Sequence, residues 1–301
     1  MAKIIECIPN ISEGRDSEII ESVVDAVRNA PGVALLDYSS DPSHNRSVIT
    51  FMGEPGSVAR AAVELAGKAA LLIDLTKHRG EHPRMGAVDV IPFVPIRETS
   101  MEECAKLAVD AAEQIWGRYA LPAYLYERAA RIKGRENLSD IRRGQFEGMA
   151  EKMKKPGWAP DFGDPAPHPT AGVVAVGARR PLVAFNMNLN TPDIEIAKAI
   201  AKTIRQSNGG WANVKAIGIM LKERGIAQVS VNMTDICRTP LYRVLEAVRF
   251  EARRWGAEVA GTEIIGLAPM SALVESAEYY LKLEHFDGCR QIMENHLQGT
   301  T

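Results

Sequence analysis

The sequence predicts a mixed α/β (α+β) fold built from two ferredoxin-like βαββαβ subdomains with a ligand groove between them. Two observations lead to this prediction. The order strand, helix, strand, strand, helix, strand occurs twice along the 301 residues. In both copies the helices carry apolar residues at three- and four-residue spacing. This order is typical of the ferredoxin-like arrangement, so we expect one subdomain at residues 1–179 and the other at 180–301.

The first copy alternates short apolar runs with amphipathic segments. Asp16 or Ser17 is suited to cap the first helix, and Pro55 suits the first turn of the second. We expect strands at 3–8, 33–38, 47–52 and 88–94, and helices that include 19–27 and 55–69.

The second copy shows the same signals. Thr191 and Pro192 favour an N-cap and first turn, and Thr239 with Pro240 opens another helix. We expect strands at 182–187 and 259–267, helices over 194–204 and 241–248, and a hairpin of 214–221 with 228–232 around Gly225.

An additional stretch follows the first copy. It contains a helix near 100–116, a strand near 121–126 and a polar region over 132–160. Exposed aromatic residues such as Trp158 and Phe162 would gain nothing in a disordered tether. We therefore interpret the polar region as an ordered crossing segment between the two halves.

Composition and charge narrow the class of protein. A net charge of −2 gives no reason to expect a nucleic-acid partner, because such partners usually demand a strongly basic surface. No run approaches the ~20 apolar residues of a membrane span, and an acid and a proline come too early for a signal peptide. The cysteines have neither zinc nor disulfide spacing, so we expect buried free thiols in a cytoplasmic protein.

The segment Lys77–Gly86 is the strongest candidate for chemistry. It holds two histidines, three cations and a carboxylate. Histidine, with an ordinary pKa of about 6.5, can both take and give a proton at neutral pH, and arginines such as Arg79 and Arg84 can hold a substrate carboxylate. His78 and His82 are four residues apart, but the glycine and proline near them interrupt any helix, so we expect no metal site.

Three other segments have two interpretations each. Residues 10–15, with Asn10 and Ser12, either bind an anion at the start of a helix or simply cap it. The segment 41–46, which ends in Arg46, is either a tight turn or part of a site. Residues 163–172 are either a ligand-binding loop or a proline-rich connector.

Several stretches resemble the formiminotransferase family, which comprises glutamate formimidoyltransferase and the first half of formiminotransferase-cyclodeaminase. The similar stretches are Glu-Cys-Ile-Pro-Asn-Ile-Ser-Glu-Gly at 6–14, Gly-Glu-His-Pro-Arg-Met-Gly-Ala-Val-Asp-Val at 80–90, Trp-Ala-Pro-Asp-Phe-Gly at 158–163, Ala-Phe-Asn-Met-Asn-Leu at 184–189 and Ala-Gln-Val-Ser at 227–230. They extend over almost the whole chain.

The resemblance implies site residues and ligands. His82 would be the catalytic acid/base, tetrahydrofolate the co-substrate and N-formiminoglutamate the donor, with a homodimer as the assembly and no metal or nucleotide required. Asn10, Ser12, Arg46, Arg79 and Arg84 are candidates for donor binding. The folate-binding stretch would be Gly163, Asp164, Pro165, Ala166, Pro167, His168, Pro169, Thr170, Ala171 and Gly172, in which Thr170 replaces a serine.

The chain departs from the family pattern at two points. Family members place an acid two residues after the position of Asp37, whereas this chain has Ser39 there and Asp41 two residues later. The chain also ends at Thr301, so we expect no deaminase domain and cyclisation of the product on another protein.

The predicted function is therefore a one-carbon transferase that moves a formimino group between N-formiminoglutamate and N5 of tetrahydrofolate. The sequence leaves two alternatives open. One is an enzyme that acts on 5-formyltetrahydrofolate, because an amidine and an amide differ by one heteroatom. The other is a folate-binding protein without catalysis, for which the missing acid at Ser39 is the argument.

Overall fold

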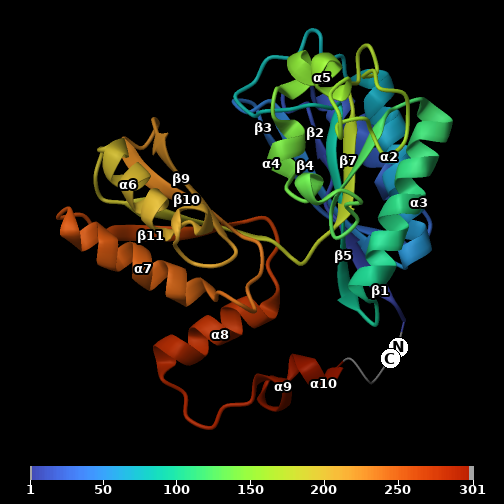
Figure 1. Ribbon diagram of the computed structural model, residues 1–301. Coiled ribbons are helices and arrows are strands. Elements are labelled where there is room, and N and C mark those ends of the chain that lie inside the picture. The colour runs from blue at the N-terminus through green and yellow to red at the C-terminus, as the bar shows by residue number, and fades with distance from the viewer. Residues whose placement is uncertain (1, 298–301) are drawn as a thin grey trace. The chain divides into compact units, whose positions relative to one another are not determined.

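The repeated order of strands and helices is present in the computed structural model, which describes residues 2–297 (Figure 1). The chain divides into two units, residues 1–180 and residues 181–301. Each unit has its own sheet and its own buried apolar core. The predicted pair of ferredoxin-like subdomains in an α+β fold is confirmed.

The first unit contains a complete βαββαβ core. Strands β1 and β2 share one position in the sheet, because both pair with β4 on one side and β5 on the other. The resulting strand order, β3-β4-β1/β2-β5, is that of a ferredoxin-like sheet. The elements are β1 (Ile4–Cys7), β2 (Asn10–Ile11), α1 (Ser17–Arg28), β3 (Val33–Asp41), β4 (Arg46–Gly53), α2 (Pro55–Leu72) and β5 (Val88–Arg97).

Two further strands extend this sheet. Helix α3 (Met101–Tyr119) carries the chain from β5 to the edge strand β6 (Ala123–Glu127). Strand β7 (Val174–Ala178) later fills the place between them, parallel to both. The sequence analysis did not predict β7, although its five residues are all buried. A parallel strand is separated from its neighbours by a long crossover. Because β5 and β6 are distant from β7 in the sequence, no short-range pattern indicated that it pairs with them.

Helices cover both faces of the first sheet (Figure 1). Helices α1, α2 and α3 pack on one face, where they form most of the buried core. Asp16 caps α1 with its side chain, as predicted, and Ser100 forms a capping box with Glu103 at the start of α3.

The polar region after β6 is ordered, as expected, but it is part of the first unit and not a crossing segment. It contains η1 (Lys133–Arg135), α4 (Leu138–Arg142) and α5 (Gln145–Met153), which pack on the second face of the first sheet. Met149 and Met153, four residues apart, place α5 against Tyr124 and Tyr126, which lie on that face of β6. The buried arginine Arg135 is paired with Asp161 at 3.0 Å.

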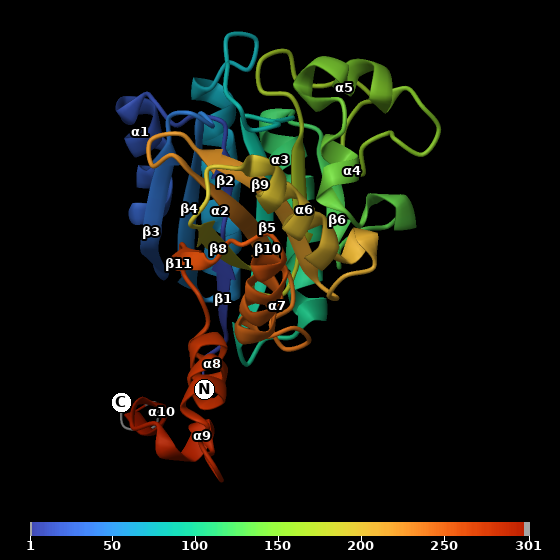
Figure 2. The same ribbon diagram turned by 90° about the vertical axis from the view of Figure 1, so that its left-hand side faces the viewer.

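The second unit repeats the ferredoxin-like order in an antiparallel sheet, β11-β8-β10-β9. Helices α6 and α7 lie side by side on one face of it (Figure 2). Asp193 caps α6, so the predicted cap at Thr191 was wrong by two residues. The elements are β8 (Val183–Leu189), α6 (Ile194–Ile204), η2 (Gln206–Asn208), β9 (Val214–Leu221), β10 (Ile226–Met233), α7 (Leu241–Arg254) and β11 (Val259–Ile265).

Three helices that the sequence analysis did not predict follow the second sheet. They are α8 (Met270–Leu281), α9 (Gly288–Gln291) and α10 (Glu294–Leu297). No helix within residues 2–297 is long and apolar enough to cross a membrane. All four cysteines are free; Cys7 and Cys104 are buried as expected, but Cys237 and Cys289 are exposed.

The packing of α5 can be tested through Met149, which is fully buried. We expect Met149→Ala to lower the free energy of unfolding by about 2–5 kcal/mol, because the substitution removes buried apolar atoms and leaves a cavity. Glu151→Ala is the control on the same helix, since the Glu151 side chain is 78% exposed, and it should change stability by less than about 0.5 kcal/mol. Urea unfolding measures both, and equal effects of the two substitutions would contradict this packing.

Candidate active site

Three loops meet beside the first sheet, and Asn45 joins them. Its side-chain carbonyl accepts a hydrogen bond from the Gly14 amide at 2.9 Å, and its side-chain nitrogen donates to the Arg79 carbonyl at 3.0 Å. Its backbone carbonyl accepts a hydrogen bond from His78 Nε2 at 2.8 Å. Asn45 is buried and its φ is +50°, in the left-handed region that asparagine tolerates better than most residues. The predicted segments 10–15, 41–46 and 77–86 are therefore brought together.

Two glycines allow these loops to approach one another closely. A Cβ atom on Gly14 would lie 2.5 Å from the Arg46 backbone nitrogen, and one on Gly80 would lie 2.3 Å from the His44 carbonyl oxygen. Any larger residue at either position would force the backbones apart.

His78 and Arg84 form a buried structural pair. His78 donates from Nε2 to a carbonyl, so its Nδ1 is unprotonated and accepts from Arg84 Nε at 3.0 Å. The Arg84 guanidinium also makes two bonds to the Glu147 carboxylate, at 2.7 and 2.9 Å. Burial is the main reason that the pKa of His78 is lowered. Arg84 is thus already held by an internal carboxylate in this structure.

His82 lies partly buried beside Arg46. Arg46 Nη1 is 3.2 Å from His82 Nε2, and because a guanidinium only donates, Nε2 is the acceptor and Nδ1 carries the proton. Burial, followed by the positive charges of Arg46 and Arg142, lowers the pKa of His82 to about 3. The imidazole is therefore neutral at physiological pH, with its one proton on Nδ1, and the imidazolium form that acts as a general acid is not populated.

The remaining predicted donor-binding residues occupy different environments. Asn10 and Ser12 bond to backbone, with Asn10 Nδ2 donating to the Ile8 carbonyl and Ser12 Oγ to the Gly86 carbonyl at 2.7 Å. Arg79 is exposed and donates to the His78 carbonyl. Asn10, Ser12 and Arg79 stabilise the loops around His82.

The turn before Arg46 contains an acid–histidine pair that the sequence analysis did not assign. Asp41 accepts a hydrogen bond from His44 Nδ1 at 2.7 Å. Partial burial raises the pKa of Asp41, but hydrogen bonds from His44 and Ser43 outweigh it and lower the pKa overall. The His44 and His82 rings are edge to face, with centroids 6.5 Å apart. The spacing of Asp41 and His44, three residues apart in a predicted turn, is the sequence signal that could have indicated this pair.

The sequence analysis also missed Asp89 and Arg142. Asp89, which is buried at the start of β5, accepts from the Met85 amide at 2.8 Å and from Arg142 Nη2 at 2.5 Å. Arg142 ends α4, and its Nε is buried without a hydrogen-bond partner among residues 2–297. Arg142 of α4 thus lies next to the loop of His82. No local sequence pattern indicates this contact.

The segment 163–172 lies alongside the loop of His82. The Ala87 amide donates to the Ala171 carbonyl at 2.9 Å, and the Val173 amide donates to the Met85 carbonyl at 3.0 Å. Gly172 has φ +70°, and a Cβ there would lie 2.1 Å from the Met85 oxygen. Within the segment, His168 Nδ1 accepts from the Ala171 amide at 3.0 Å, whereas Asp164, Pro165, Ala166 and Pro169 are exposed.

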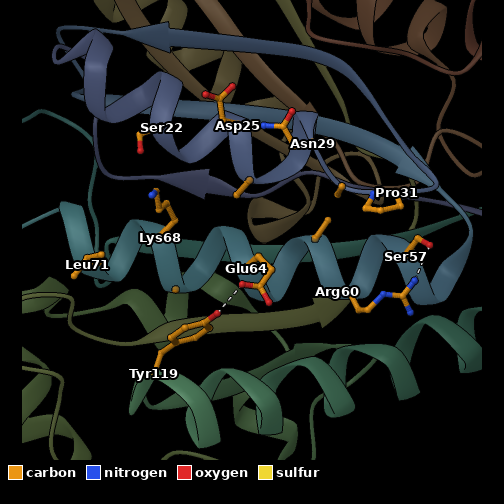
Figure 3. A pocket seen from close by; sticks show the side chains of 14 residues that line it. Ser22, Asp25, Asn29, Pro31, Ser57, Arg60, Glu64, Lys68, Leu71 and Tyr119 are labelled. Carbon is orange, nitrogen blue, oxygen red and sulfur yellow. Dashed lines mark hydrogen bonds between the residues drawn. The ribbon is translucent and has the colours of Figure 1, made fainter.

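A cavity of about 760 Å³ lies elsewhere in the first unit, between α1 and α2 near Tyr119 of α3 (Figure 3). Its acids are already engaged, since Glu64 accepts from the Tyr119 hydroxyl at 3.0 Å and Asp25 pairs with Arg28. None of the predicted site residues lines it. No group of three or more metal-ligating side chains converges in the described chain.

Comparison with known proteins agrees with the two-unit architecture. The model of the formiminotransferase domain, N-terminal subdomain, matches residues 4–179, and that of the formiminotransferase domain matches residues 184–295. The chain belongs to the formiminotransferase family. The family resemblance noted in the sequence is confirmed.

Similar curated proteins cover nearly the whole chain. It is 55% identical to glutamate formimidoyltransferase of Streptococcus pyogenes, over 99% of this chain and 100% of that protein. It is 44% identical to glutamate formimidoyltransferase of Thermoplasma acidophilum, over 94% of both. Formimidoyltransferase-cyclodeaminase of Gallus gallus is 43% identical over 94% of this chain and 53% of its own length.

The lowered pKa values of His78 and His82 predict a pH-dependent stability. Between the unfolded value of about 6.5 and the lower folded values, the unfolded chain binds more protons than the folded protein, so stability falls as the pH falls through this window. We expect His82→Gln to make this fall shallower by up to about 1.4 kcal/mol per pH unit, because one such proton is removed.

Urea unfolding between pH 4.5 and 7.5 measures the effect. Lys77→Gln, at an exposed cation of the same loop, should give a curve parallel to that of the unsubstituted protein. A parallel curve for His82→Gln as well would show that His82 takes up protons equally in both states.

Proposed function

We propose that this chain transfers the formimino group from N-formiminoglutamate to N5 of tetrahydrofolate, with His82 as the base. The observation that carries the proposal is the neutral imidazole of His82, which lies beside the cation of Arg46. A neutral imidazole can accept a proton from an attacking nitrogen, and a cation can hold the carboxylate of an acidic donor. The names of the bacterial and archaeal relatives support the same reaction.

The proposed step conserves atoms and protons. The N5 lone pair attacks the amidine carbon and forms a carbon–nitrogen bond, while His82 Nε2 takes the N5 proton. The bond from that carbon to the glutamate nitrogen then breaks, and His82 returns the proton to this leaving nitrogen. The products are 5-formiminotetrahydrofolate and glutamate, and the histidine ends in its starting state.

Tetrahydrofolate is proposed to bind along residues 163–172. The backbone bonds between this segment and residues 85–87 support the proposal, because they fix the segment next to the loop of His82. A cytoplasmic location and a homodimer belong to the same proposal. The location rests on the composition and the cysteine spacing, and the homodimer rests on the family resemblance.

The role of His82 predicts a large and specific loss of turnover. We expect His82→Ala to lower the rate of formimino transfer by about 10²–10⁴, which is the usual contribution of a general acid/base. Folate affinity should stay within a few-fold. His285→Ala, at an exposed histidine of the second unit, should turn over normally.

Steady-state rates with N-formiminoglutamate and with 5-formyltetrahydrofolate as alternative donors measure this. Near-normal turnover by His82→Ala would refute the mechanism, and faster turnover with the formyl donor would replace the proposed substrate.

The folate segment predicts protection on binding. Adding tetrahydrofolate or folinate should slow hydrogen exchange at amides within residues 163–172, because the ligand would cover this partly exposed stretch. The exposed turn at Lys222–Gly225 of the second sheet provides an internal reference that should not change. Slowed exchange confined to other segments would place the folate site elsewhere.

A further inference from the structure

Arg46, which lies beside His82, has no carboxylate partner among residues 2–297. Among the described residues, Arg142 is paired with Asp89, Arg84 with Glu147 and His44 with Asp41. Arg46 is partly buried, and its guanidinium donates a hydrogen bond to a neutral imidazole instead of a carboxylate. A guanidinium has five N–H donors, and removing it from water without an anion is unfavourable. Arg46 therefore makes no ion pair among the described residues, although the charges of Asp89 and Asp41 also act on it.

Arg142 makes the same region more electropositive. Its side chain is 17% exposed, its Nη2 bonds to Asp89, and its Nε has no hydrogen-bond partner among residues 2–297. Its positive charge lowers the pKa of both Arg46 and His82. The charged groups with the largest effect on His82 are Arg46 from β4, Arg142 from α4, His44 from the β3–β4 turn and His78 from its own loop, whereas Asp89 and Asp41 act on Arg46.

We propose that Arg46 and Arg142 form a binding site for one carboxylate of the donor. The bound carboxylate breaks the hydrogen bond between Arg46 and His82 Nε2, so that Nε2 can accept a proton. The inference rests on the proposed function for the identity of the donor. In a bond from Arg46 to a carboxylate both partners are charged, whereas in its present bond to His82 only the donor is, so the carboxylate is the stronger acceptor. Without the donor, the lone pair that must accept the N5 proton is occupied by Arg46.

Freeing Nε2 also makes protonation easier. The carboxylate offsets the two arginine charges that disfavour the imidazolium, so the pKa of His82 rises when the donor binds. The imidazolium formed during attack on the amidine carbon is then stable enough to exist, yet acidic enough to return its proton to the leaving nitrogen. His82 thus becomes competent for both halves of the reaction only in the donor complex.

The tautomer of His82 tests this directly by NMR of ¹⁵N-imidazole-labelled protein, with His82→Gln used for assignment. N-acetylglutamate is the probe, since it has both carboxylates but an amide in place of the amidine. The ligand-free protein should show the Nδ1–H tautomer with Nε2 as a hydrogen-bond acceptor. Saturation with N-acetylglutamate should remove that hydrogen bond and raise the pKa of His82 by at least about one unit. N-acetylglutamine, which lacks the side-chain carboxylate, identifies which carboxylate acts.

Substitutions provide a second readout. Arg46→Gln should raise the KM for N-formiminoglutamate by about 10- to 100-fold, as expected for loss of a bond to a charged group, and should free Nε2 without any ligand. Arg46→Lys should recover part of the KM. Arg142→Gln should raise the KM but keep the ligand-free tautomer. Arg143→Gln, the exposed neighbour of Arg142 with a 79% exposed side chain, is the matched control and should change neither.

The results separate this inference from the proposed function. An Nε2–H tautomer in the ligand-free protein, or an N-acetylglutamate complex with unchanged His82 signals, would overturn the inference even if formimino transfer is normal. If no transfer from N-formiminoglutamate occurs but N-acetylglutamate still shifts His82, the carboxylate site stands and the proposed donor reaction falls.

Discussion

The candidate site depends on the hydrogen bonds of Asn45. A single buried amide satisfies the backbone of two other loops, and its own carbonyl fixes the tautomer of His78. His78 in turn orients Arg84, which is bonded to Glu147 on α5. Leaving a buried polar group without its hydrogen bond costs free energy, so each hydrogen bond in this series favours one arrangement of the loops. His82 and Arg46 are held by that arrangement, although neither belongs to the network.

The surroundings of His82 explain its electrostatics. Hydrogen bonds of Asn45 and Asp89 hold the loops around the imidazole, which is partly buried. Desolvation and two nearby guanidinium groups both act against the imidazolium. This electrostatic environment supports the proposed anionic donor, and the pKa of His82 lies well below that of an ordinary histidine.

The two units share the ferredoxin-like strand order, but the first unit contains additional strands and helices. The second unit keeps a four-stranded sheet in ferredoxin-like order. The first unit adds β6 and β7, together with helices on the second face of its sheet. This addition supplies Arg142 from α4, and it brings residues 171–173 next to residues 85–87. The candidate chemistry of the first unit thus lies where the extra elements join the common core.

The sequence by itself determined the repeated βαββαβ order, a cap at Asp16 or Ser17 and the hairpin around Gly225, and it indicated the loop of His82 as the candidate for chemistry. These features follow from local patterns, namely apolar spacing, capping chemistry and turn residues. Tertiary structure alone decided the place of β7, the packing of α5 and the approach of Arg142 to Asp89. It also decided that His78 is structural and that His82 is held neutral, because tautomers and pKa values depend on burial and on charges that are distant along the chain.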